Sequence, residues 1–140
     1  MSFLLDTNAV SEWQKPLPDP GFATWFAAID EDSLFLSVVT LAELRFGVER
    51  LPASRRRTRL QTWLEEDLTR RFAGRVLGVD SAVAHVWGRL AARAAAAGRA
   101  MGDRDAILAA TAQAAGLTVV TRNVRDFAVT GTPVLNPWVG

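Results

Sequence analysis

Short apolar runs alternate with helix-length segments along the 140-residue chain, and this alternation limits the possible folds more than any other feature. The runs are typical of short buried strands and lie at residues 3–5, 34–36, 76–79, 117–121 and 134–135. Strands separated in this way need crossover connections, which join parallel strands. The sequence therefore predicts an α/β fold, a three-layer α/β/α sandwich with a mainly parallel central sheet, in a single domain spanning residues 1–140.

The segments between these runs carry apolar residues at helical spacing. Helices are predicted over residues 7–13, 22–29, 41–51, 54–72, 81–98 and 103–115. Local chemistry gives several boundaries: Pro52 closes one helix, Asp80 or Ser81 caps another, and Gly116 ends the last.

The absence of cysteine removes a large set of functions. Without thiols the chain has no disulfide, thiolate zinc site, iron–sulfur cluster or cysteine nucleophile, and one histidine, His85, excludes a multi-histidine metal site. His85 lies among apolar residues and is expected to be a packed or surface side chain. Any metal ion must therefore be held by oxygen.

The apolar stretches are shorter than the roughly 20 residues that span a bilayer. The N-terminus also lacks a basic region followed by an apolar segment and a cleavage site. We therefore expect a cytoplasmic protein with no membrane partner.

Acidic and amide side chains occur where predicted strands end or the following helices begin. Asp6 follows the first strand, Glu43 lies in the helix after the second, Asp105 lies in the first turn of its helix, and Asn123 and Asp126 follow residue 121. Ligands of parallel α/β sheets bind beyond the carboxyl ends of the strands. These residues are therefore predicted to converge on one site.

Each of these residues also has a purely structural interpretation. Asp6 is a candidate helix N-cap, residues 40–43 spell a capping box ending at Glu43, Asp103 is a candidate cap for the helix of Asp105, and Asn123 is a candidate cap for a short turn. Taken one at a time, the structural interpretation is at least as good as the functional one. The functional interpretation rests on the occurrence of all these acidic and amide residues at positions that can share one end of the sheet.

Converging carboxylates need compensation, because like charges raise one another's pKa. Mg²⁺ or Mn²⁺ supplies it and prefers oxygen ligands. Such a site activates water for attack on a phosphodiester, which is nuclease chemistry. A phosphoaspartyl hydrolase with Asp6 as nucleophile is an alternative, weakened because Asn8 stands where that class usually has a second carboxylate.

These motifs resemble those of the PIN-domain toxins of VapBC-type toxin–antitoxin pairs, which are small ribonucleases. The resemblance covers essentially the whole chain, and its matching segments are LLDTN (4–8), VVTLAELRFG (38–47), DAILAATA (105–112), LTVVTRN (117–123) with the following Asp126 and Phe127, and NPW (136–138). It implies an Mg²⁺-dependent endoribonuclease, with Mn²⁺ as an alternative ion. The implied partners are an RNA substrate, a cognate antitoxin and a second copy in a homodimer.

The resemblance also assigns roles to individual residues. The metal-binding acids are Asp6, Glu43 and Asp105, and the fourth catalytic acid is Asp126, although some relatives carry aspartate at the position of Asn123. In this hypothesis Asp6 and Asp105 anchor the ion, while Glu43 and Asp126 bind a second ion or position the attacking water. The supporting residues are Asn8, Thr121 and Asn123, and Asp103 is a cap rather than a ligand.

Three questions stay open at this point. The arginines at positions 55–57 and 59 contact either RNA phosphates or an antitoxin, or form a solvated helix face. Trp13, Trp25 and Trp138 belong either to an interface or, more commonly for tryptophan in a small protein, to the core. The alternative function is a catalytically inactive PIN-like module that binds RNA or protein.

Overall fold

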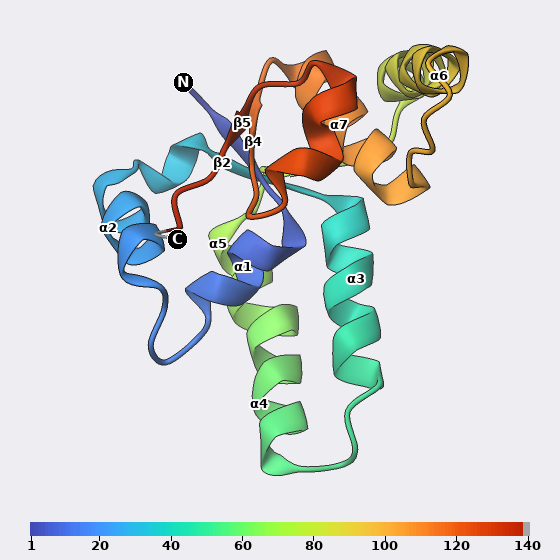
Figure 1. Cartoon of the computed structure of the whole chain (residues 1–140). Coiled ribbons are helices and arrows are strands. Elements are labelled where there is room, and N and C mark those ends of the chain that lie inside the picture. Colours follow the sequence, from blue (N-terminus) through green and yellow to red (C-terminus); the bar gives the residue numbers. More distant parts are fainter. Residues whose placement is uncertain (139–140) are drawn as a thin grey trace.

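The computed structural model describes residues 1–138 and contains a parallel sheet covered by helices on both faces (Figure 1). Its strands are β1 (Phe3–Leu5), β2 (Leu34–Ser37), β3 (Val76–Leu77), β4 (Thr118–Val120) and β5 (Val134–Leu135). They are arranged in the order β3-β2-β1-β4-β5, and every neighbouring pair is parallel. The predicted fold class is confirmed, because the sheet is parallel and each predicted apolar run overlaps one of these strands.

Helices connect the strands, as their spacing required. They are α1 (Thr7–Trp13), α2 (Pro20–Ala28), α3 (Val38–Glu49), α4 (Arg55–Thr62), α5 (Thr69–Arg71), α6 (Ser81–Ala96) and α7 (Asp103–Ala115). Short 3-10 helices form η1 (Glu31–Ser33) and η3 (Val124–Thr130), and the segment η2 (Trp63–Leu68) is π-helical. The predicted helix over residues 54–72 is therefore confirmed as the run α4, η2 and α5, with a widened turn that periodicity did not reveal.

The residues of β1 divide the core into two layers. Phe3 and Leu5 pack into one hydrophobic cluster, whereas Leu4 between them packs into another. Successive side chains of a strand point to opposite faces of the sheet, so the two clusters lie on opposite faces. A continuous apolar run at β1 follows from burial on both faces.

The first face is covered by α1 to α4 and η2, and it is rich in aromatic rings. Trp13 stacks on Phe26 at 5.3 Å between ring centroids, and Phe22 contacts Trp138 at 5.0 Å. Trp138 is buried and Trp25 packs against the same cluster, so these two tryptophans belong to the core. The second face is covered by α6, α7 and η3, with Leu108 and Phe127 fully buried.

The helix ends place the segments that follow the strands. Asp80 caps α6 by accepting a 3.0 Å hydrogen bond from the Val83 N–H, and Gly116 ends α7 with φ of 69°. Both boundaries were predicted. Figure 1 shows α3 and α4 side by side as an antiparallel hairpin that extends away from the sheet. Within residues 1–138, no helix combines the length and apolar character needed to span a membrane.

Candidate active site at the carboxyl ends of the strands

Asp6 occupies the position between β1 and α1. Its Oδ1 accepts a 2.7 Å hydrogen bond from the Thr7 N–H, which makes Asp6 the N-cap of α1. Its Oδ2 accepts a 2.7 Å hydrogen bond from the Thr121 hydroxyl just beyond β4. Because the side chain is fully buried, these bonds fix the direction of both oxygens. The capping and functional interpretations of Asp6 are therefore compatible.

Glu43 reaches the same place from α3. Its Oε1 accepts a 2.7 Å hydrogen bond from the Thr7 hydroxyl, so α1 positions Glu43 as well as Asp6. The capping-box interpretation of residues 40–43 is wrong, because α3 begins at Val38 and Ser37 is its N-cap. Glu43 thus lies beyond the first turn, where its carboxylate is free to face the end of the sheet.

Asp105 enters from the first turn of α7, on the other side of β1. The N-cap of this helix is Gly102, without a side-chain hydrogen bond, so the interpretation of Asp103 as the cap is wrong. We call Asp6, Glu43 and Asp105 the acidic cluster. These residues are far apart in the chain, and the structure brings their carboxylates to one point, where the same side chain, Arg104, contacts all three.

Arg104 is the residue that the sequence interpretation missed. Its guanidinium donates one hydrogen bond to each carboxylate of the acidic cluster: Nη2 to Asp6 Oδ1, Nε to Glu43 Oε1, and Nη1 to Asp105 Oδ1. Nη2 also lies 3.5 Å from the Thr7 hydroxyl. One signal was available. A positive charge in the first turn opposes the helix dipole, so a tertiary reason for Arg104 was to be expected.

The charges of the site perturb one another. Burial raises the pKa of Asp105, and the Asp126 and Asp6 carboxylates raise it further against the opposing effect of Arg104. Burial also disfavours the charged guanidinium, but the attraction of Asp6 and the other two acids outweighs it and raises the pKa of Arg104. The guanidinium therefore stays charged and offsets the repulsion within the cluster.

The remaining predicted residues surround the acidic cluster. Thr121 accepts a 3.4 Å hydrogen bond from Asn8 Nδ2 and a 3.0 Å bond from the Asn123 N–H. Asn8 Oδ1 in turn accepts from the Arg122 N–H at 3.3 Å. Asn8 therefore supports Thr121, and through it Asp6, whereas Asn123 contributes a backbone group. The predicted side-chain cap at Asn123 is not formed.

Asp126 lies beside Asp105 and is shared by two surface hollows. The first, of about 380 Å³, is lined by Asp105 and Asp126 together with Arg99 and Arg125. The second, of about 590 Å³, is lined by Asp126 and Arg125 and also by Arg122, Asn123 and Asn136. Asp126 thus shares a hollow with Asp105, whereas Asn123 lines only the second hollow, and arginines line both.

The donor chemistry of the acidic cluster suits a hard divalent cation, since all three side chains offer carboxylate oxygen. Among residues 1–138, however, no three acidic or histidine side chains are close enough to hold a metal ion in this arrangement. Three different nitrogens of the Arg104 guanidinium each bind one of the three carboxylates, so the carboxylates surround this side chain. The residues therefore fit a metal ion by their chemistry.

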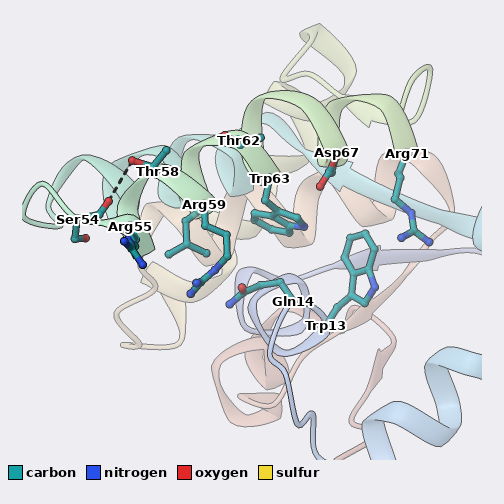
Figure 2. A pocket seen from close by; sticks show the side chains of 11 residues that line it. Trp13, Gln14, Ser54, Arg55, Thr58, Arg59, Thr62, Trp63, Asp67 and Arg71 are labelled. Carbon is teal, nitrogen blue, oxygen red and sulfur yellow. Dashed lines mark hydrogen bonds between the residues drawn. The ribbon is translucent and has the colours of Figure 1, made fainter.

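Another hollow, of about 870 Å³, is lined by none of these acids. Figure 2 shows Trp13 and Gln14 at the end of α1 on one side of it, with Arg59 and Trp63 of α4 and η2 on the other. Arg71 lies over the Trp13 ring at 4.6 Å. We call this hollow the aromatic recess. It lacks a carboxylate cluster, and its rings and guanidinium groups suit a binding surface.

A parallel α/β sheet with an acidic site beyond its strands defines the class of this protein. The profile of the family described as "PIN domain" matches residues 3–132. The chain belongs to the PIN-domain family. The predicted resemblance is therefore confirmed.

Individual relatives align with this chain over nearly their full length. The VapC ribonuclease Y4jK of Sinorhizobium fredii is 41% identical over 135 residues, which is 96% of each chain. The crystal structure of FitAcB from Neisseria gonorrhoeae matches with a TM-score of 0.91 and 35% identity, covering 97% of this chain and 98% of that one. VapBC-5 from Mycobacterium tuberculosis, described as a member of the VapBC family of toxin–antitoxin systems, matches with a TM-score of 0.69 and 31% identity, covering 99% and 98%.

Proposed function

We propose that this protein is a metal-dependent endoribonuclease that acts as the toxin of a toxin–antitoxin pair. The observation that carries the proposal is the convergence of the acidic cluster on one point beyond β1, from α1, α3 and α7. The ribonuclease name of a 41% identical relative supports the reaction class. The similarity to a VapBC toxin–antitoxin system supports the physiological role.

In this proposal the acidic cluster holds Mg²⁺ or Mn²⁺, which when bound makes water a better nucleophile and offsets charge on the phosphate. The protein's own residues supply position. Thr121 and Thr7 fix the carboxylates of Asp6 and Glu43 through 2.7 Å hydrogen bonds. Asp126, next to Asp105 but outside the cluster, accepts a proton from the attacking water.

The hollows on either side of Asp126 are proposed to receive the RNA strand. Arg99 and Arg125 line the first and Arg122 lines the second, so phosphates of a bound strand meet positive charge on both sides of the acids. Asn123 and Asn136 provide hydrogen-bonding groups in the second hollow for sugar or base edges. This arrangement binds the backbone while bringing one phosphate to the acidic cluster.

The antitoxin is proposed to bind at the aromatic recess. Its exposed arginines and partly buried indole rings fit a segment that combines apolar and acidic side chains. This gives the α4 arginines a protein partner, rather than the RNA phosphates that the sequence left as an alternative.

The test replaces Asp105 by Asn, which removes a charge and changes little in size. Cleavage of structured RNA in Mg²⁺ is expected to disappear, while the circular dichroism spectrum stays that of the wild type. The wild type is expected to lose cleavage in chelator and regain it with Mg²⁺. Unchanged cleavage by the variant would overturn the assignment.

One observation favours the inactive binding module as a second candidate. Arg104 forms ion pairs with all three acids of the cluster, so their charge is already balanced without a metal ion. The two candidates differ in metal binding: an enzyme binds Mg²⁺ through these acids, whereas a module stabilised by Arg104 alone does not.

A further inference from the structure

Each of the three guanidinium nitrogens of Arg104 donates a hydrogen bond to a different acid. Its partners are the individual oxygens Asp6 Oδ1, Glu43 Oε1 and Asp105 Oδ1, one from each carboxylate of the acidic cluster. These are oxygens that a divalent cation in the cluster would also need. The guanidinium and a metal ion would therefore compete for these three oxygens.

The local sequence gives no reason for an arginine at this position. Arg104 follows Gly102 and Asp103 in the first turn of α7, where exposed helix N–H groups favour negative charge and disfavour positive charge. A residue that contradicts the local preference is held by tertiary contacts, and such conflicts concentrate at functional sites. The contacts of Arg104 reach residues 61 and 98 positions away.

Side-chain exposure distinguishes Arg104 from Asp6. The Arg104 side chain is 33% exposed, whereas the Asp6 side chain is 0% exposed and is held by Thr7 and Thr121. The guanidinium can leave toward solvent without disturbing the core, while the carboxylate of Asp6 stays. Asp6 is thus a fixed part of the site and Arg104 a replaceable one.

We propose that Arg104 is a built-in counter-ion that keeps the acidic cluster assembled before metal binds and that the metal must displace. This inference rests on the proposed function, since it concerns the same site. It makes Arg104 a positioning residue that acts through the acids. It also means that Arg104 lowers the affinity for Mg²⁺: the protein binds the ion more weakly than the three carboxylates would without this arginine.

The test measures Mg²⁺ binding by calorimetry without RNA, so that the result does not depend on cleavage. Arg104→Met is expected to bind Mg²⁺ about tenfold more tightly than the wild type, the equivalent of roughly 1.4 kcal/mol. A merely damaged site would bind more weakly, so the direction of the change identifies the role. In chelator the variant is expected to melt roughly 5 °C below the wild type, because the acids then repel one another.

Arg125→Met is the matched control, because Arg125 lines the hollow that contains Asp105 and Asp126. It removes the same charge beside the site without removing a contact to the cluster's oxygens. An equal gain in Mg²⁺ affinity in both variants would mean that general electrostatics is responsible, and would overturn the inference. So would unchanged or weaker binding by Arg104→Met.

A measurement on the wild type covers the case in which Arg104→Met does not fold. The Nε–H of Arg104 donates to Glu43, so its NMR signal is expected to move to the position of a solvated arginine when Mg²⁺ is added. A signal that stays in place while Mg²⁺ binds would overturn the inference and leave the proposed function standing. If neither protein binds Mg²⁺ or Mn²⁺, the proposed function fails together with it.

Discussion

The Thr121 hydroxyl donates a 2.7 Å hydrogen bond to Asp6 Oδ2 across the ends of two neighbouring parallel strands. The two residues are 115 positions apart, and both are almost completely buried. The pairing of β1 with β4 thus sets the direction of the most buried acid of the site.

Removal of this hydroxyl is the first prediction. Thr121→Val keeps the shape of the side chain but leaves a buried carboxylate oxygen without its donor, so we expect unfolding free energy to fall by about 1–3 kcal/mol. RNA cleavage is expected to fall by roughly 10- to 100-fold, as for other groups that orient metal ligands. Urea unfolding and cleavage rates check both values. Thr118→Val makes the same exchange at the start of β4 and is the control. It is expected to change neither the unfolding free energy nor the cleavage rate by a comparable amount.

The second prediction concerns the fourth acid. Asp126→Asn is expected to reduce cleavage by roughly 100-fold or more, because its carboxylate is proposed to accept the proton of the attacking water. Mg²⁺ binding by the acidic cluster should remain within about twofold. Since Asp126 also raises the pKa of Asp105, the pKa of Asp105 measured by NMR should fall. Asn123→Ala is the comparison, and a larger loss of cleavage there would reverse the assignment.

The third prediction concerns RNA binding by Arg125, measured in an Asp105→Asn background so that the substrate stays intact. Arg125→Ala is expected to weaken binding about tenfold, the loss of a charge-assisted hydrogen bond of roughly 1.5 kcal/mol. The slope of log affinity against log salt should fall by about 1. Arg93→Ala on the exposed face of α6 removes the same charge and is expected to change neither quantity. Equal effects would refute the proposed path.

The fourth prediction addresses the aromatic recess. Arg59→Glu is expected to weaken binding of a cognate antitoxin by about tenfold or more, because like charges then face each other. Mg²⁺ binding should be unchanged. Arg56→Glu, on the same helix but outside the recess, is the control, and both are measured by calorimetry. If the two variants weaken the complex equally, the recess is not the docking site.

The fifth prediction concerns Glu12, a buried acid outside the acidic cluster. It accepts hydrogen bonds from Trp138 Nε1 at 3.0 Å, the Asp19 N–H at 2.9 Å and Lys15 Nζ at 3.1 Å. The bond from Trp138 contributes most to holding the pKa of Glu12 near 2, against a model-compound value of 4.5, while burial acts in the opposite direction. Glu12 therefore ties α1 to the segment after β5.

Because this pKa is lowered on folding, Glu12 stabilises the protein above about pH 4.5, and the contribution is lost as the pH falls toward 2. Glu12→Gln is expected to cost about 1–3 kcal/mol at pH 7. The difference from the wild type should shrink between pH 4.5 and 2 in urea unfolding. Glu66→Gln, an exposed acid, is the control. A difference that does not depend on pH would show that shape, not charge, is what Glu12 supplies.

The order of the elements was readable from the sequence because it depends on near neighbours. Residues 3–5 had to be a buried strand, since three consecutive large apolar side chains cannot be solvated on either face. Gly116 was recognisable as a helix end because its φ of 69° suits glycine. Segment η2, in contrast, is a wider helical turn, and apolar spacing did not distinguish it from an α-helix.

The candidate site was predictable only in part. Asp6 and Glu43 could be named because they follow strands whose carboxyl ends must share one edge of the sheet, whereas Asp105 was named from its place in the first turn of a helix and from the family resemblance. The capping box at residues 40–43 and the cap at Asp103 were wrong, because short cap motifs fit several registers and only backbone geometry selects one. Glu12 had no local signal at all, since its partners include Trp138 at the opposite end of the chain.

The sequence by itself determined the parallel α/β architecture and the residues able to carry acid chemistry. Periodicity and side-chain type are local properties, so both can be read from the sequence without knowledge of the fold. Only the tertiary structure decided that Arg104 sits among the carboxylates and that Thr7 and Thr121 aim them. Those choices depend on distances of a few ångströms between residues up to 115 positions apart, which are fixed when the two faces of the sheet pack.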